Sequence, residues 1–244
     1  NETGPTQYDG DFRGLYLVLE QPDGRLLEEH GLADGNFYKM ESWTGELNNQ
    51  GPTQPSDKSD LNAFLNTYNN TTPSDQWWRD NLDLQRYYSY RSIVEAIHHY
   101  DIHAGKNYFY YHNPVNGKWE VHPWDLDLVW GNNMYGNGNE PFKSRVLSRP
   151  VFAQEYRNRM REVRDLLYNQ EQLSMLIGEY SYFIDRPGPT SFVEADRAMW
   201  DYNPILISSY IVPDRADVGR FYESSPTNDF PGMKEFMLAL PRCG

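Results

Sequence analysis

The sequence has almost no cysteine, little positive charge and no long apolar run. Cys243 is the single cysteine among the 244 residues, which excludes an internal disulfide and a cysteine-based zinc site. Lys and Arg total 22 against 35 Asp and Glu, and the formal net charge is −13. Because phosphates repel such a surface, we expect no nonspecific binding to nucleic acid. No apolar stretch approaches the length of a membrane span, so we expect no transmembrane segment.

The start of the chain also lacks features. It has no initiating methionine and none of the basic and apolar regions of a signal peptide, which suggests a mature or processed product. What is present is enough for a sizeable core, since 39% of the residues are hydrophobic and 15% aromatic. We therefore expect one domain or one large lobe of mixed α+β class, with strands first and helices after.

Apolar periodicity and the positions of glycine and proline predict the individual elements. We expect a buried strand over residues 14–21, a short helix over 25–30, a short strand over 37–40, an exposed loop over 44–59 and a hairpin from 108–111 and 119–121. We expect one helix to begin at Leu61 and another to begin after an N-cap at Ser74 or Asp75. A third is expected from Arg91 through Asp101 to near Gly105. Further helices are expected over 151–168, 171–184, 192–200 and 233–238.

The stretch from His122 to Gly131 carries Asp125 and Asp127 between large apolar side chains. In an extended segment side chains alternate between faces, so both carboxylates are expected to point the same way. Neighbouring acids favour a cation or proton between them, and Mg²⁺ takes carboxylates together with phosphate oxygens. The competing interpretation is an edge strand with two solvated acids, because short motifs are weakly specific.

Asp101, Asn107 and Asp125 together suit phosphoryl transfer. This chemistry needs an acid that orients the attacking hydroxyl, and an amide and a carboxylate that hold Mg²⁺ against the phosphates of ATP. Protein kinases use H-R-D-x-x-x-x-N followed by D-F-G for these tasks. Here Tyr100-Asp101 takes the place of R-D and Asp125 that of the acid in D-F-G. Asn107 takes the place of the asparagine, one position later than usual.

The sequence resembles the CotH kinases, a family named for spore coat protein H that has an atypical protein-kinase-like fold. The resemblance is carried by residues 14–21 (GLYLVLEQ), 36–39 (NFYK), and 107–111 (NYFYY) leading to 123–127 (PWDLD) and Gly131. These stretches follow, in order, the family's glycine-leucine-tyrosine strand ending in Glu, its N-x-Y-K turn, and its hairpin of N-Y-x-x-Y followed by W-D-x-D-x-x-x-G. Coverage runs from about residue 10 to residue 183.

The resemblance implies a role for each site residue. Asp101 would be the catalytic aspartate that receives or orients the substrate hydroxyl. Asn107 and Asp125 would bind Mg²⁺ or Mn²⁺ with ATP, and Asp127 would support that metal site. The implied activity is phosphorylation of Ser or Thr in secreted, coat or surface proteins, and the implied location is extracellular or at the cell or spore surface.

The resemblance also implies how the chain is organised. A single CotH-like domain would span residues 1–244, with the end of the N-lobe and the hinge in 1–40 and the C-lobe in 41–244. The strand ending at Glu20 and Gln21 would be the hinge whose backbone meets the adenine. No glycine-rich loop or lysine-bearing strand precedes it, and Lys39 follows it. We therefore expect a shortened chain, a cleaved product still bound to an N-terminal fragment or partner chain, or a degenerate relative.

Other functions stay open from the sequence. One is a noncatalytic surface or scaffold module that has lost its phosphate-binding lobe. Another is a metal-dependent glycosyltransferase, in which D-x-D holds Mn²⁺ and a nucleotide-sugar diphosphate, although no nucleotide-binding βαβ unit precedes it. A histidine zinc site is disfavoured because His98 and His99 are adjacent and no H-E-x-x-H occurs. The tyrosines of residues 108–111 are expected to pack in a sheet and not to bind sugar.

Overall fold

The computed structural model describes residues 15–127, 129 and 137–184. The chain divides into two compact units, one of residues Glu20–Tyr168 and one of Asn1–Leu19 with Asn169–Gly244. The smaller unit contains α7 (Gln170–Ile184), which confirms the helix predicted over residues 171–184. Gly131 and the helices predicted over 192–200 and 233–238 lie outside the described residues. Among the described helices, none combines the length and apolar character needed to cross a membrane.

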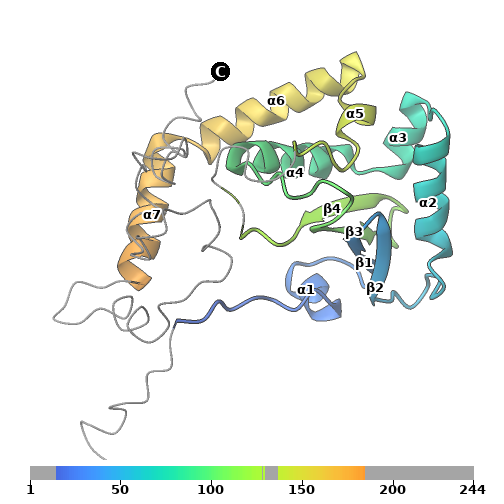
Figure 1. The fold of residues 1–244 in the computed structure, drawn as a ribbon, viewed down its shortest axis with the longest axis horizontal. Coiled ribbons are helices and arrows are strands. Elements are labelled where there is room, and N and C mark those ends of the chain that lie inside the picture. Colours follow the sequence, from blue (N-terminus) through green and yellow to red (C-terminus); the bar gives the residue numbers. More distant parts are fainter. Residues whose placement is uncertain (1–14, 128, 130–136, 185–244) are drawn as a thin grey trace, which may run out of the picture. The chain divides into compact units, whose positions relative to one another are not determined.

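The larger unit is built on a four-stranded antiparallel sheet in the order β2-β1-β3-β4 (Figure 1). The strands are β1 (Asn36–Glu41), β2 (Thr44–Asn49), β3 (Tyr108–His112) and β4 (Trp119–Pro123). The predicted strand and hairpin are thereby confirmed. The loop predicted over residues 44–59 is wrong at its start, where β2 forms. Its sequence TGELNN has no apolar alternation, and its pairing with β1 at the sheet edge makes it a strand.

The described part of this unit also contains six helices: α1 (Gly24–Glu29), α2 (Ser59–Asn70), α3 (Asp75–Asn81), α4 (Leu84–Ile97), α5 (Lys143–Val146) and α6 (Pro150–Leu166). Ser74 caps α3, since its side chain accepts from the Trp77 backbone N–H, as predicted. The predicted extension of α4 through Asp101 is wrong. His98 has φ +52, and this left-handed residue ends the helix at Ile97.

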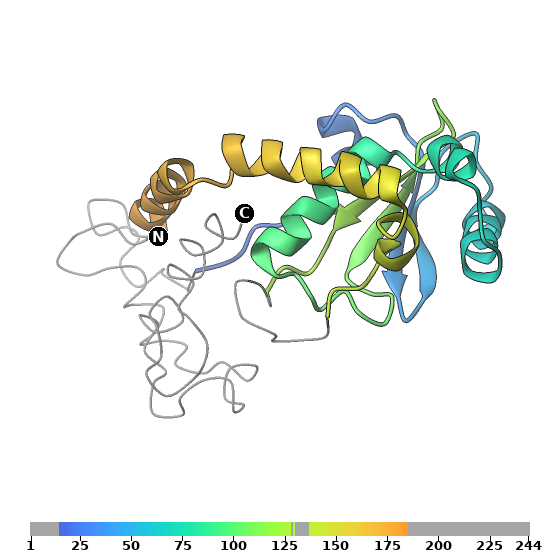
Figure 2. The same ribbon diagram turned by 90° about the horizontal axis from the view of Figure 1, so that it is seen from above.

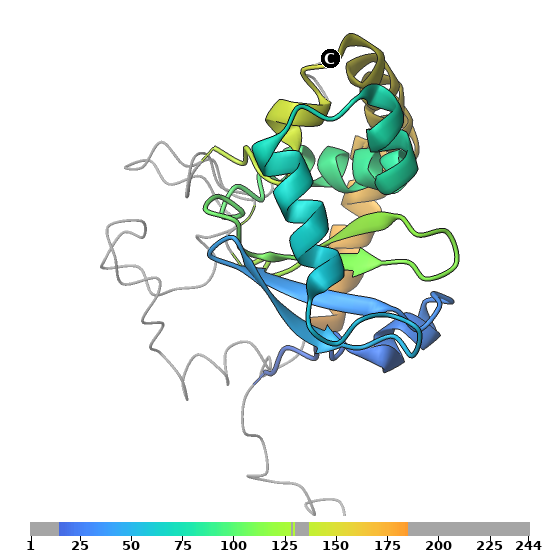
Figure 3. The same ribbon diagram turned by 90° about the vertical axis from the view of Figure 1, so that its right-hand side faces the viewer.

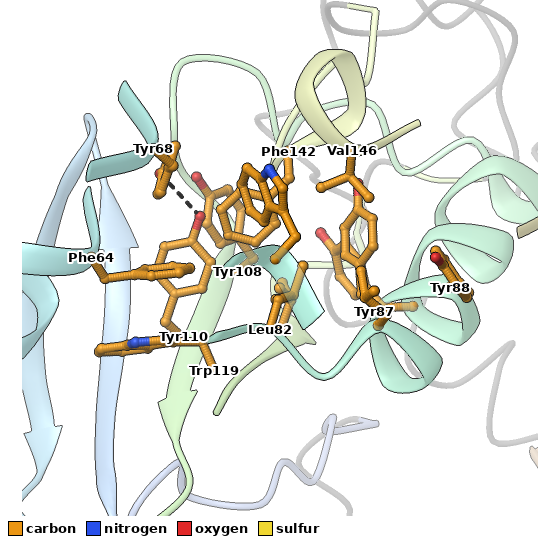
Figure 4. Close-up of a cluster of buried hydrophobic side chains, with 14 of the residues drawn as sticks. Phe64, Tyr68, Leu82, Tyr87, Tyr88, Tyr108, Tyr110, Trp119, Phe142 and Val146 are labelled. Carbon is orange, nitrogen blue, oxygen red and sulfur yellow. Dashed lines mark hydrogen bonds between the residues drawn. The ribbon is translucent and has the colours of Figure 1, made fainter. Parts of the chain in front are cut away.

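Side chains alternate between the two faces of the sheet, as a period of two residues requires. One face carries Tyr38, Met40, Tyr108, Tyr110, Trp119 and Val121, which pack in a single core with side chains from α2, α3, α4 and α6 (Figure 4). The opposite face carries Phe37, Phe109 and Tyr111, which pack against Leu27 of α1 and against Trp124. The tyrosines of β3 are all buried, so the prediction that they pack in the sheet is confirmed.

The helical layer lies on the first of these faces (Figures 1 and 2). Within it, α4 packs against both α6 and β4, while α2 lies beside the sheet (Figure 3). Stacked aromatics join α2 to the sheet: the rings of Phe64 and Trp119 lie 4.8 Å apart at 14°. The Asp83 N–H donates to the Trp119 carbonyl at 2.9 Å and so fixes the start of α4 against β4.

The strand predicted over residues 14–21 is wrong where the structure describes it. Residues 15–21 have no regular structure, and Leu17 and Val18 are 83% and 91% exposed. An apolar, β-branched run has strand propensity, but a strand also needs a hydrogen-bonded neighbour. In the described part of the chain the sheet has four strands, and residues 15–21 are not among them. The hinge-like strand of the expected fold is thus not formed, whereas the α+β class is confirmed.

Candidate functional site

The β3–β4 hairpin brings the two motif stretches to the same end of the sheet. Its register pairs Tyr108 with Pro123, so Asn107 and Trp124 lie opposite each other just beyond the strands. The Trp124 N–H donates to the Asn107 carbonyl at 3.2 Å, which closes this end of the hairpin. Asp125 therefore follows directly beside Asn107, although the two are far apart in the sequence.

Asp125 and Asp127 do not lie on an extended strand, which corrects the prediction. β4 ends at Pro123, Asp125 has φ +57, and Asp127 lies in a turn. A left-handed residue breaks the two-residue alternation, so a shared face no longer follows from their spacing. Aspartate tolerates this backbone region better than most residues, and such conformations cluster at functional sites. Both aspartates are exposed.

Asp101 lies in the loop between α4 and β3 and is held by Asn107. The two residues are only 5% and 4% exposed. Nδ2 of Asn107 donates to Oδ2 of Asp101 at 3.0 Å and to its backbone carbonyl at 3.1 Å. Asn107 itself has φ +62, as asparagine tolerates. These two bonds fix the orientation of the amide and leave its Oδ1 as the atom that can bind a cation.

The side chains of Lys106 and His103 approach the same carboxylate. Nζ of Lys106 lies 3.1 Å from Oδ1 of Asp101 and 3.2 Å from Oδ2. Nδ1 of His103 lies 3.7 Å from Oδ1. The buried acid is thus compensated by an ammonium and an amide, as a buried charge requires. The sequence analysis did not assign a role to Lys106, and its adjacency to Asn107 was the only available signal.

His99 contacts the backbone of the site residue Asn107. It is fully buried, and its Nε2 donates to the Asn107 carbonyl at 3.3 Å. Burial lowers the pKa of His99, so the ring is neutral at pH 7. The bond to Asn107 and the negative charges of Asp101 and Asp125 oppose that shift. The sequence analysis weighed His99 only as a zinc ligand, yet His99-Tyr100-Asp101 has the H-x-D spacing of H-R-D.

The turn between β1 and β2 supports the loop that carries Asp101. The Trp43 N–H donates to the Gly105 carbonyl at 3.2 Å. Gly105 has φ +66, and a Cβ there would lie 2.7 Å from Cδ2 of Trp43 and 2.8 Å from its N. Glycine is required for both reasons. The sequence analysis missed Trp43 because no local pattern reports a contact between residues so far apart.

Comparison with known proteins identifies the family. Residues 6–210 match the family described as CotH kinase protein. The chain belongs to the CotH kinase protein family. It is also similar to a protein named inner spore coat protein H from Bacillus subtilis (strain 168), with 21% identity over 235 residues. That match covers 83% of this chain but 64% of the relative, so the chain spans less than two thirds of the length of that protein.

The match to the CotH kinase family includes every residue of the site. The donor atoms present suit Mg²⁺, which binds one or two carboxylates together with phosphate oxygens and water. Oδ1 of Asn107 and the carboxylate of Asp125 are such hard oxygen donors at one end of the hairpin. Within the described ranges, no three His, Cys, Asp or Glu side chains form a metal-binding group. The role predicted for Asp127 stays a prediction.

The predicted adenine contacts lie at the start of the larger unit. Oε2 of Glu20 is 2.9 Å from Nε2 of His30, and both side chains are 56% exposed. The Gln21 carbonyl accepts from the Asp23 N–H at 2.8 Å in the turn that leads into α1. The strand that was to present these residues to adenine is not formed, and their role stays a prediction.

Proposed function

We propose that this chain is the catalytic region of a CotH-type kinase, which transfers the γ-phosphoryl group of ATP to Ser or Thr hydroxyls of proteins. The observation that carries the proposal is the buried Asp101, hydrogen-bonded to Asn107 at 3.0 Å, beside the end of the hairpin that presents Asp125. An acid, an amide and a second acid in one loop and hairpin are the groups that phosphoryl transfer needs.

In this mechanism Asp101 orients the acceptor hydroxyl and takes its proton. The hydroxyl oxygen forms the new bond to the γ-phosphorus, and the bond from that phosphorus to the β–γ bridging oxygen breaks. ADP leaves with the electron pair of that bond. Bound Mg²⁺ or Mn²⁺ would neutralise phosphate charge, and Asn107 and Asp125 would hold it. His99, neutral because it is buried, donates to the Asn107 carbonyl and so holds the loop that bears Asp101 and Asn107.

The name of the similar Bacillus protein supports a proposed location and substrate class. Inner spore coat protein H is named as a coat component, so we propose a location at a cell or spore surface, with coat or secreted proteins as substrates. A partner chain or an N-terminal fragment that supplies a phosphate-binding lysine is part of the same proposal, because phosphoryl transfer uses such a lysine.

One observation favours a noncatalytic module as the second candidate. Lys106 lies against both carboxylate oxygens of Asp101, which are the atoms that a substrate hydroxyl must reach. In a degenerate relative this ion pair would be permanent, and the protein would act as a surface or scaffold module. No comparable observation supports a glycosyltransferase, since the described sheet is antiparallel.

Nucleotide titration with and without metal separates the two candidates. We expect the purified protein to bind a nonhydrolysable ATP analogue in the presence of Mn²⁺ and to bind it much more weakly after chelation. Asp125→Ala should lose this metal dependence, while Asp80→Asn, an exposed change on α3, should not alter it. Equal binding by the wild type with and without Mn²⁺ would contradict the proposed metal site.

A further inference from the structure

Lys106 occupies the position that a substrate would have to take on Asp101. Its side chain is 31% exposed, whereas that of Asp101 is 7% exposed, and Nζ lies within 3.2 Å of both carboxylate oxygens. Oδ2 also accepts from Asn107 at 3.0 Å. An acceptor hydroxyl must come within about 2.6–3.2 Å of the base that takes its proton. The ammonium and the hydroxyl therefore compete for the same carboxylate.

The backbone around Lys106 is fixed, so the competition must be resolved by its side chain. Gly105 and Asn107 on either side have φ +66 and +62, and the Gly105 carbonyl is bonded to the Trp43 N–H. Asn107 is further tied to Asp101 by two hydrogen bonds. A lysine side chain is a flexible four-carbon stem with three donors, and it can reorient without moving this frame.

The phosphates of ATP offer this ammonium a second anionic partner, since lysine binds phosphate as a point charge. Asn107 and Asp125 mark where the metal and the phosphates would bind, and Lys106 is the immediate neighbour of Asn107. We propose that Lys106 is a positioning residue that exchanges partners: its Nζ pairs with Asp101 in the nucleotide-free protein and moves onto the transferable γ-phosphoryl group when ATP binds. This inference rests on the proposed kinase function.

The exchange gives Lys106 two roles. It compensates the buried charge of Asp101 before nucleotide arrives, and it then holds the phosphoryl group while it frees Asp101 for the hydroxyl. It also makes a specific signature, because ADP lacks the group to which Nζ moves. A lysine with a purely structural role would affect ATP and ADP equally.

The experiment measures the affinity of the purified protein for ADP and for a nonhydrolysable ATP analogue, each with Mn²⁺, by calorimetry. We expect Lys106→Met to weaken binding of the analogue about 10- to 100-fold, the range for losing a hydrogen bond to a charged group, with ADP changed by less than about 3-fold. Lys106→Arg should restore most of the difference. Lys118→Met, in the turn at the opposite end of the hairpin, should match the wild type.

Each outcome decides the matter. If Lys106→Met changes neither affinity, or changes both by the same factor, the exchange is overturned. Failure of Lys106→Arg to recover discrimination between the two nucleotides would overturn it as well, and this variant keeps the charge that Asp101 needs. If the wild type transfers phosphate and Asp125→Ala does not, such results refute only the inference about Lys106. A wild-type protein that binds no nucleotide would overturn the kinase proposal and this inference together.

Discussion

Gly105→Ala tests whether the turn at Trp43 holds the loop of Asp101 in place. At φ +66 an alanine costs about 1–2 kcal/mol relative to glycine. Its Cβ would also lie 2.7–2.8 Å from ring atoms and the backbone N of Trp43, so one of the two segments must shift. Loss of the Trp43 N–H bond to the Gly105 carbonyl adds about 0.5–1.5 kcal/mol. We expect a total destabilisation of about 2–3 kcal/mol by urea unfolding.

Gly117→Ala is the matched control. Gly117 has φ +71, but no atom lies within 4 Å of a Cβ built there, so an alanine at this position has the unfavourable backbone conformation without a steric clash. We expect it to lose about 1–2 kcal/mol and to keep full phosphate transfer. Gly105→Ala should also lower transfer about 100-fold, the effect of a shift of about 1 Å at a reacting group. Equal loss of stability and unchanged transfer in both variants would show that the turn at Trp43 does not hold the loop of Asp101 in place.

Three further predictions concern buried polar groups. Asp60 is partly buried, which raises its pKa, but hydrogen bonds led by the one from His112 lower the pKa by more, so it lies below the usual value. The ionised Asp60 stabilises the fold above the unfolded-state pKa of about 3.9, and this stability is lost as pH falls through the lower folded-state pKa. Asp60→Asn should therefore make the free energy of unfolding depend less on pH in this acidic range. Asn107→Asp keeps an oxygen ligand but replaces two donors to Asp101 with a like charge, and we expect phosphate transfer to fall at least about 100-fold. His99→Leu removes the buried donor to the Asn107 carbonyl, and we expect a loss of about 1–3 kcal/mol in urea unfolding; unchanged stability would show that this bond is not made.

Local signals in the sequence were enough to predict the β3–β4 hairpin. The aromatic run at residues 108–111, the turn residues after it and the apolar residues at 119–121 define β3 and β4 without distant information. The same local signals wrongly predicted a strand at residues 15–21, because an apolar run forms a strand only where a partner strand exists. They failed in the opposite direction at β2, a polar segment that pairs with β1.

Contacts across the fold could not be predicted from the sequence. The left-handed backbone of Asp125 breaks the alternation that the spacing of Asp125 and Asp127 suggested. Trp43 reaches Gly105 only because the β1–β2 turn folds back onto the loop after α4. Lys106 is adjacent to Asn107 in sequence, yet only the fold shows that its Nζ lies on Asp101. These tertiary contacts determine which atoms of the site are available for chemistry.

Phosphate transfer by Asp101→Asn tests directly whether Asp101 acts as the base. Labelled ATP, Mn²⁺ and a coat or secreted protein substrate are incubated with the wild type, with Asp101→Asn and with the exposed control Asp80→Asn. If Asp101 takes the proton of the hydroxyl, its variant should transfer phosphate about 10²- to 10⁴-fold more slowly while it still binds nucleotide, and the control should match the wild type. Transfer at the wild-type rate by Asp101→Asn would show that Asp101 does not take the proton of the hydroxyl.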